Sequence, residues 1–196
     1  MNQEPDGLSA HPTIQITLPE WADDLDLSRR YETDEEKMRL AIDLSRRNVT
    51  AGTGGPFGAA ILDVGSGEVV AVGVNSVVRL NNCTLHGEMV AIMAAQARLG
   101  VFTLRGASGR SYELITSCEP CAMCLGATLW SGVVRVVCGA HRDDARRLDF
   151  EEGPVFPASH EYLEARGIEI VQGVLREEAN QVLELYRASK GTIYNG

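Results

Sequence analysis

Two short stretches decide how this sequence is interpreted: His86-Gly87-Glu88 and, further along the chain, Pro120-Cys121-Ala122-Met123-Cys124. Each stretch precedes an apolar-periodic segment, so each is predicted to open a helix. Cys121 and Cys124 are three residues apart and project from one face of that helix start, where partial positive charge favours thiolates. Thiolates and a neutral imidazole bind zinc, and three such ligands leave a fourth tetrahedral position to water. The pattern therefore predicts a catalytic metal site formed by His86, Cys121 and Cys124.

Glu88 lies two residues beyond His86 and is expected to reach the water without ligating the metal. Zinc lowers the pKa of bound water from about 15.7 to about 7. A carboxylate beside that water can take its proton and return it to a ring nitrogen and then to a leaving amine. Glu88 is therefore the predicted catalytic proton shuttle.

Two other interpretations of the cysteine motif stay open at this point. A purely structural zinc site needs a fourth protein ligand, for which Cys83 or Cys118 would be the candidate, and it gives Glu88 no role. A redox Cys-x-x-Cys pair would leave both His86 and Glu88 unexplained. A third interpretation is a catalytically inert interaction or scaffold protein with the same fold as an enzyme. This interpretation is also disfavoured, because such a protein would have no function for the Glu88 carboxylate.

Composition limits the class of protein. The 196 residues, 44% of them hydrophobic, suit one domain with a full core plus a terminal extension. The net charge is −9, and Lys and Arg form no sequence cluster longer than a pair, so we expect no nucleic-acid partner. The absence of a long apolar run or a signal-like N-terminus predicts no membrane association. The five cysteines, an odd number, fit a reducing compartment, so we expect a cytoplasmic protein.

Periodicity predicts alternating helices and strands after an N-terminal extension at residues 1–31. Thr33-Asp34-Glu35-Glu36 is a capping box that begins a helix ending near residue 50. The following predicted elements are strands at 57–64 and 69–75, a helix at 86–99, a strand at 112–117, a helix at 120–130, a strand at 133–139, a short helix within 140–165, a strand at 168–174 and a helix at 177–190. This order indicates an α/β fold with a mixed sheet covered by helices on both faces.

Beyond the zinc motif, His-x-Glu with Pro-Cys-x-x-Cys, four stretches carry a family resemblance. They are Gly54-Gly55-Pro56-Phe57-Gly58, Val74-Asn75, the segment from Thr116 through Trp130, and Phe150-Glu151-Glu152. Residues 33–196 thereby resemble the cytidine deaminase superfamily, specifically its bacterial guanine deaminase branch (guanine/ammeline deaminase-like). The resemblance implies a three-layer α/β/α fold with a central mixed five-stranded sheet, forming a zinc-dependent deaminase domain over residues 32–196.

The resemblance also implies roles for individual residues. Asn75 matches an asparagine that hydrogen-bonds the purine ring, Phe57 an aromatic that packs against the base, and Trp130 an aromatic that walls the pocket. Glu152 matches a second acid used as an additional proton shuttle. Gly87 stands where alanine is usual, which is expected to leave extra room near the leaving group.

The resemblance further implies one Zn²⁺ per subunit and a homodimer. In the dimer, the C-terminal tail at about 191–196 would be exchanged between subunits and close the partner's site. The tip of that tail carries Ile193 and Tyr194, and an apolar-aromatic tip is expected to dock. Tyr194 is therefore a further substrate-binding candidate.

The substrate expected from this resemblance is guanine, converted to xanthine and ammonia. Alternatives with the same N=C–NH2 unit are s-triazines such as ammeline and cytosine-type bases such as isocytosine and 5-azacytosine. Guanosine remains an alternative if the loop at 76–85 leaves space for ribose. An RNA-directed role, as in tRNA adenosine deaminases, is disfavoured by the acidic balance.

Overall fold

The computed structural model describes residues 13–195. Residues 1–12 of the expected extension and Gly196 of the expected tail lie outside the described residues. The helices are α1 (Asp34–Thr50), α2 (Val77–Leu80), α3 (Gly87–Leu99), α4 (Ala122–Ser131), α5 (Arg142–Arg146), α6 (Pro157–Glu164) and α7 (Arg176–Ala188). The strands are β1 (Gly58–Asp63), β2 (Val69–Val74), β3 (Tyr112–Cys118), β4 (Arg135–Ala140) and β5 (Glu169–Val171).

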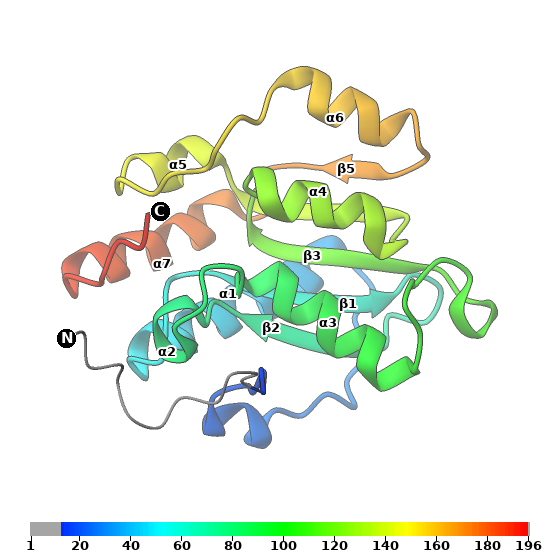
Figure 1. The fold of residues 1–196 in the computed structure, drawn as a ribbon, viewed down its shortest axis with the longest axis horizontal. Coiled ribbons are helices and arrows are strands. Elements are labelled where there is room, and N and C mark those ends of the chain that lie inside the picture. Colours follow the sequence, from blue (N-terminus) through cyan, green and yellow to red (C-terminus); the bar gives the residue numbers. More distant parts are fainter. Residues whose placement is uncertain (1–12, 196) are drawn as a thin grey trace, which may run out of the picture.

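The five strands form one mixed sheet in the order β2-β1-β3-β4-β5. β1 pairs antiparallel with both β2 and β3, whereas β3–β4 and β4–β5 are parallel (Figure 1). The antiparallel β1–β2 pair is a hairpin, as expected for two strands separated by Gly65-Ser66-Gly67. The parallel strands need crossovers, and α4 supplies the one between β3 and β4.

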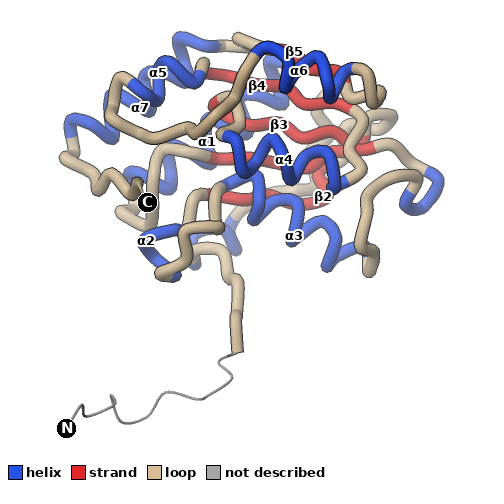
Figure 2. The backbone as a smooth tube through the Cα atoms, turned by 45° about the horizontal axis from the view of Figure 1, so that its top comes forward, coloured by secondary structure: helices blue, strands red, loops and turns tan. Residues whose placement is uncertain are grey.

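Helices cover both faces of the sheet, as Figure 2 shows. Side chains alternate along each strand, so neighbouring residues face opposite layers. Ala60 and Leu62 of β1 pack in the cluster that contains α1 and α7. Ala59 and Ile61 pack in the cluster that contains α3 and α4. The expected three-layer α/β/α fold with a five-stranded mixed sheet is confirmed.

Most element boundaries follow the sequence signals. The predicted capping box is present at the start of α1, where the Thr33 side chain accepts from the Glu36 backbone and Glu36 caps in return. α3 and α4 both end at a glycine in the left-handed region, Gly100 and Gly132. Some boundary predictions were wrong. For example, α4 does not begin at Pro120, because Cys121 is its N-cap.

The described part of the N-terminal extension packs against the domain. Leu18 and Trp21 contact the core cluster of α1 and α7, and the Trp21 indole N–H donates to Thr53 Oγ1 at 3.0 Å. Burial of these side chains adds apolar contact to that layer. Among residues 13–195, no helix has the length and apolar character needed to cross a bilayer.

Candidate active site

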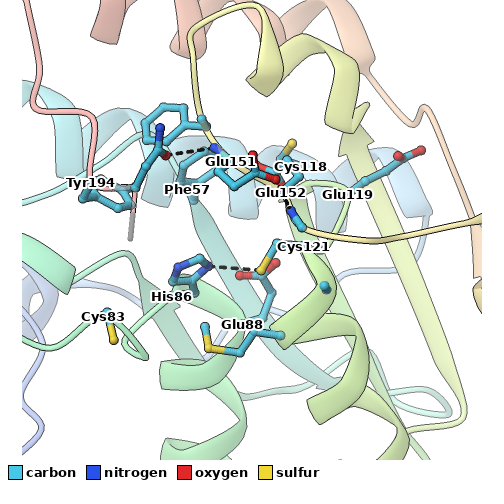
Figure 3. Close-up of a pocket in the computed structure, with 15 residues that line it drawn as sticks. Phe57, Cys83, His86, Glu88, Cys118, Glu119, Cys121, Glu151, Glu152 and Tyr194 are labelled. Atoms are coloured by element: carbon cyan, nitrogen blue, oxygen red, sulfur yellow. Dashed lines mark hydrogen bonds between the residues drawn. The ribbon is translucent and has the colours of Figure 1, made fainter.

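The three predicted ligands come from the starts of two neighbouring helices. His86 is the N-cap of α3, Cys121 is the N-cap of α4, and Cys124 lies in the first turn of α4. Their ligand atoms all lie within 4.8 Å of one another, and Cys121 Sγ is 3.5 Å from His86 Nδ1 (Figure 3). α3 and α4 pack on the same face of the sheet, and this packing brings their N-termini together.

The donor set fits zinc. The proximity of Cys124 and of the His86 ring lowers the pKa of Cys121 to about 4. Thiolate and imidazole are ligands that zinc prefers. Among the residues that the structure describes, the group contains these three side chains and no fourth. Three protein ligands are typical of a catalytic zinc site, and the structural-site interpretation through Cys83 or Cys118 gains no support.

Two carboxyl groups flank this cluster. Glu88, on the first turn of α3, is buried, and its burial raises its pKa. Glu152 is also buried, and burial followed by repulsion from the Cys121 thiolate raises its pKa to about 8. Carboxyl groups with raised pKa values can hold or release a proton near neutral pH. The site therefore offers two proton-transfer groups beside the candidate metal position.

These groups open into one cavity of about 290 Å³. Aromatic side chains form part of its wall: the Phe150 ring lies 5.1 Å from the Phe57 ring and 5.1 Å from the Tyr194 ring, measured between centroids. The volume is at the low end of the roughly 300–1,000 Å³ of small-molecule sites. A single planar heterocycle suits such a cavity.

The tail folds back over this cavity in its own chain. Tyr194 lines the cavity, and the end of its phenol packs against the α-carbon of Gly55. The Tyr194 hydroxyl is buried and has no hydrogen-bond partner within residues 13–195, and burial raises its pKa. The sequence led us to expect that the tail tip docks, and the resemblance implied that it closes the partner's site. Here it lies at the cavity of its own chain, and exchange between two subunits stays a prediction.

The expectation that Trp130 walls the pocket was wrong for the pocket of its own chain. Trp130 is 79% exposed and is not among the residues that line the cavity. It lies six residues after Cys124, which rotates it by about 240° around α4, away from the sheet and from the ligands.

The expectation that Gly87 leaves extra room near the leaving group was also wrong, because the space of the missing side chain does not face the cavity. A Cβ added at Gly87 would lie 3.3 Å from the backbone oxygen of Phe57, so the missing methyl group faces the chain entering β1. Gly87 does not line the cavity. Its small size therefore permits close approach of α3 to Phe57 and does not enlarge the space around a substrate.

Asn75 is fully buried at the end of β2. Its Oδ1 accepts from the Val77 backbone at 3.4 Å, and its Nδ2 has no partner among the described residues. Asn75 lies near enough to Tyr194 to affect the pKa of its hydroxyl, although it does not line the cavity with the tail in this position. An unpaired buried amide donor is costly unless a ligand uses it.

Phe150 and Asn195 are among the lining residues that the sequence analysis did not assign to the site. Phe150 opens the Phe-Glu-Glu stretch, so that stretch was the available signal. Asn195 carried no signal, because its contacts depend on the path of the tail.

Comparison with known proteins agrees with this geometry. The model of the family described as cytidine and deoxycytidylate deaminase zinc-binding region matches residues 31–140. The chain belongs to this deaminase family. A guanine deaminase from Bacillus subtilis (strain 168) is 37% identical over 143 residues, 73% of this chain and 87% of the relative.

Solved structures extend the likeness beyond the zinc-binding region. A guanine deaminase from Nitrosomonas europaea has a TM-score of 0.82 at 38% identity, covering 90% of this chain and 97% of its own. A structure in complex with 2,6-diaminopurine has a TM-score of 0.85 at 39% identity, covering 92% and 96%. The deaminase family resemblance inferred from the sequence is confirmed.

Proposed function

We propose that this deaminase removes the 2-amino group of guanine with water, giving xanthine and ammonia. The observation that carries the proposal is the pairing of a His86-Cys121-Cys124 cluster with two buried carboxyls in one small aromatic cavity. The similarity to guanine deaminases from two bacteria, and to a protein solved with 2,6-diaminopurine, supports a purine with an amino group at C2.

His86, Cys121 and Cys124 would hold one zinc ion per chain. Zinc at this position supplies a Lewis acid that lowers the pKa of water, so that hydroxide is available at neutral pH. The N-termini of α3 and α4 also favour the charged form of the thiolates.

Glu88 and Glu152 divide the proton transfers. Glu88 takes the proton of the attacking water and returns it to N3 of guanine, the unprotonated ring nitrogen next to the carbon under attack. Glu152 is the additional shuttle: it delivers its proton to the departing amine, so that the C2–N bond breaks and ammonia leaves. It regains a proton from the C2 hydroxyl, which carries the second proton of the water and becomes the carbonyl of xanthine. Burial raises the pKa of both carboxyl groups, and the pKa of Glu152, about 8, suits it to exchange a proton near neutral pH.

Recognition of the base falls to the aromatic wall and to Asn75. Phe57 and Phe150 offer ring surfaces to a flat heterocycle, and Tyr194 closes the cavity from the tail. The unpaired Nδ2 of Asn75 can donate to an acceptor on the purine edge.

Ammonia release from the zinc-loaded protein tests the proposal directly. The panel comprises guanine, guanosine, ammeline, cytosine, isocytosine, 5-azacytosine and adenine. We expect the highest kcat/KM for guanine and a loss of about 10²-fold or more for Asn75→Ala, since a lost buried hydrogen bond removes discrimination. A higher kcat/KM for a triazine or a pyrimidine would reject guanine while leaving the deaminase chemistry in place.

We also propose a homodimer. Exchange of the tail between subunits stays a separate prediction, because in this structure the tail covers the cavity of its own chain. Support comes from two exposed aromatic side chains near the outer ends of α3 and α4, Phe102 at 91% and Trp130 at 79% exposed. Such side chains are typical of association surfaces. Light scattering at micromolar concentration should give the mass of a dimer, and Trp130→Lys should weaken it; a monomer would reject the proposal.

The proposed location is the cytoplasm. All five cysteines are free in the structure, including the exposed Cys83. Unpaired thiols and an intact thiolate metal site are stable in a reducing compartment.

A further inference from the structure

Glu152 lies on a loop, and its position therefore depends on what holds that loop. The segment from Asp149 to Gly153 joins α5 to α6 without regular structure. On the inner side, the Glu152 carbonyl accepts from the Ala122 backbone N–H at 2.9 Å, which ties the loop to the start of α4. Asp149 has a φ of 68°, in the left-handed region, so the loop needs fixed contacts to keep this shape.

On the outer side, the loop is held by one side chain of the tail. Asn195 Oδ1 accepts from the Glu151 backbone N–H at 2.9 Å, and Asn195 Nδ2 donates to the Asp149 carbonyl at 2.6 Å. The amide thus forms a two-bond bridge across three consecutive loop residues. Figure 3 shows one of these bonds as a dashed line to the loop beside Glu152.

The path of the tail brings Asn195 to this place. The Tyr186 hydroxyl of α7 donates to the Thr192 carbonyl at 2.6 Å, which fixes the tail soon after the helix ends. The ring of Tyr194 then packs 5.1 Å from the ring of Phe150, measured between centroids. Asn195 follows directly, at the edge of the loop.

We propose that Asn195 is a positioning residue for Glu152: its side-chain amide clamps the 149–151 backbone and thereby sets the carboxyl of Glu152 in the cavity. The tail thus covers the cavity and holds the loop of the second proton shuttle at the same place. Asn195 does not transfer protons, and its effect passes through the loop backbone. The inference rests on the proposed role of Glu152 and goes beyond it by naming what holds that residue in place.

The energetic consequence follows from the geometry. Without the Asn195 amide, the Glu151 N–H and the Asp149 carbonyl would hydrogen-bond to water instead. The loop would then lose the two hydrogen bonds that connect it to the tail. Misplacement of a catalytic group by about 1 Å can reduce the rate by about 10²-fold, and partial displacement of a secondary shuttle should cost less. We therefore expect Asn195→Ala to lower kcat by about tenfold with little change in KM.

A double-mutant cycle with Glu152 separates positioning from general damage. The zinc-loaded full chains compared are wild type, Asn195→Ala, Glu152→Gln and the double variant, assayed with guanine. If Asn195 acts through Glu152, its substitution lowers kcat in the wild type and has little further effect in the Glu152→Gln background. Thr192→Ala is the matched control, since this neighbouring tail side chain is exposed and the hydrogen bonds from the tail to the loop are those of Asn195.

Amide hydrogen exchange gives a readout independent of activity. We expect the Glu151 amide to exchange faster in Asn195→Ala and unchanged in Thr192→Ala. Asn195→Asp keeps the acceptor for Glu151 and should retain most of the protection of this amide.

The outcomes distinguish the two proposals. An unchanged kcat in Glu152→Gln overturns the proposed shuttle, and the exchange rate of the Glu151 amide still reports whether Asn195 holds the loop. A lowered kcat in Glu152→Gln combined with additive losses in the double variant overturns the positioning role alone. Unchanged exchange at Glu151 in Asn195→Ala overturns it as well, as does a rise in KM at constant kcat.

Discussion

The Sγ atom of Cys121 lies 3.5 Å from Nδ1 of His86, although 35 positions separate the two residues in the sequence. Both residues are N-caps, one of α3 and one of α4, and both helices pack on the same face of the sheet. The metal position is therefore set by helix packing as much as by the motif itself.

Cys121→Ser should lose both the metal and the activity, because zinc would keep only two strong protein ligands. Metal analysis of the purified variant measures the first loss, and ammonia release the second. Cys138→Ala is the matched control, since this buried cysteine of β4 lies outside the ligand group and should keep one zinc per chain. Stoichiometric zinc in Cys121→Ser would contradict the ligand assignment.

Glu88→Gln should keep the fold and the zinc while kcat falls by about 10²–10⁴-fold or more, because the amide cannot take the proton of water. Circular dichroism and metal content check the first part, and steady-state kinetics the second. Glu161→Gln, an exposed change on α6, serves as the control. Turnover retained by Glu88→Gln would remove this residue from the proton path.

Glu152→Gln should slow turnover less than Glu88→Gln does, because Glu152 is the second of the two shuttles. Its neighbour Glu151 is exposed and its carboxylate accepts from the Gly153 backbone N–H at 2.7 Å. Glu151→Gln should therefore have a smaller effect on kcat than Glu152→Gln. The reverse order in a side-by-side assay would transfer the role to Glu151.

Asp144 should make the stability of the fold depend on pH. Its buried carboxylate accepts two hydrogen bonds of 2.8 Å from Arg176, and this pairing holds its pKa below the ordinary value of 3.8. A lowered folded-state pKa contributes stability above the unfolded pKa, and that contribution is lost as pH falls below it. Asp144→Asn should thus cost about 1–2 kcal/mol at neutral pH, where the charge-assisted bonds are intact.

Urea unfolding midpoints at several pH values test this dependence. The gap between wild type and Asp144→Asn should narrow as the pH falls below about 4, because the wild-type carboxylate also becomes protonated. Asp143→Asn is the matched control one residue away, with an exposed side chain and a surface ion pair to Arg146 that contributes little. A gap that stays constant down to acid pH would assign the loss to packing.

The sequence predicted the parts of the site that depend on local structure. His86, Cys121 and Cys124 could be placed because helix starts are signalled by periodicity and because ligand spacing restricts the metal. Trp130 could not be placed by resemblance alone, since the face on which it lies depends on where α4 begins and on how the helix packs. Asn195 could not be predicted either, because it binds backbone atoms of a loop more than forty residues earlier.

For the fold as well, features set by local sequence could be predicted, whereas others could not. Alternation of helices and strands sufficed for the layers and for the mixed sheet, whereas the four-residue α2 was missed because such a short segment has no periodicity of its own. β5 was predicted too long, since only Glu169–Val171 pair with β4 before the chain turns toward α7.

Gly55 and Tyr194 are distant in the sequence, but a side chain at position 55 would occupy the same space as the Tyr194 phenol. A methyl group at position 55 would overlap the phenol of Tyr194, so Gly55→Ala and a docked tail exclude each other unless one of them shifts. Protein engineering could therefore use the size of residue 55 to control whether the tail closes the cavity. A bulkier side chain there would keep the entrance open and could admit substrates larger than a free base, at the cost of protection from bulk water.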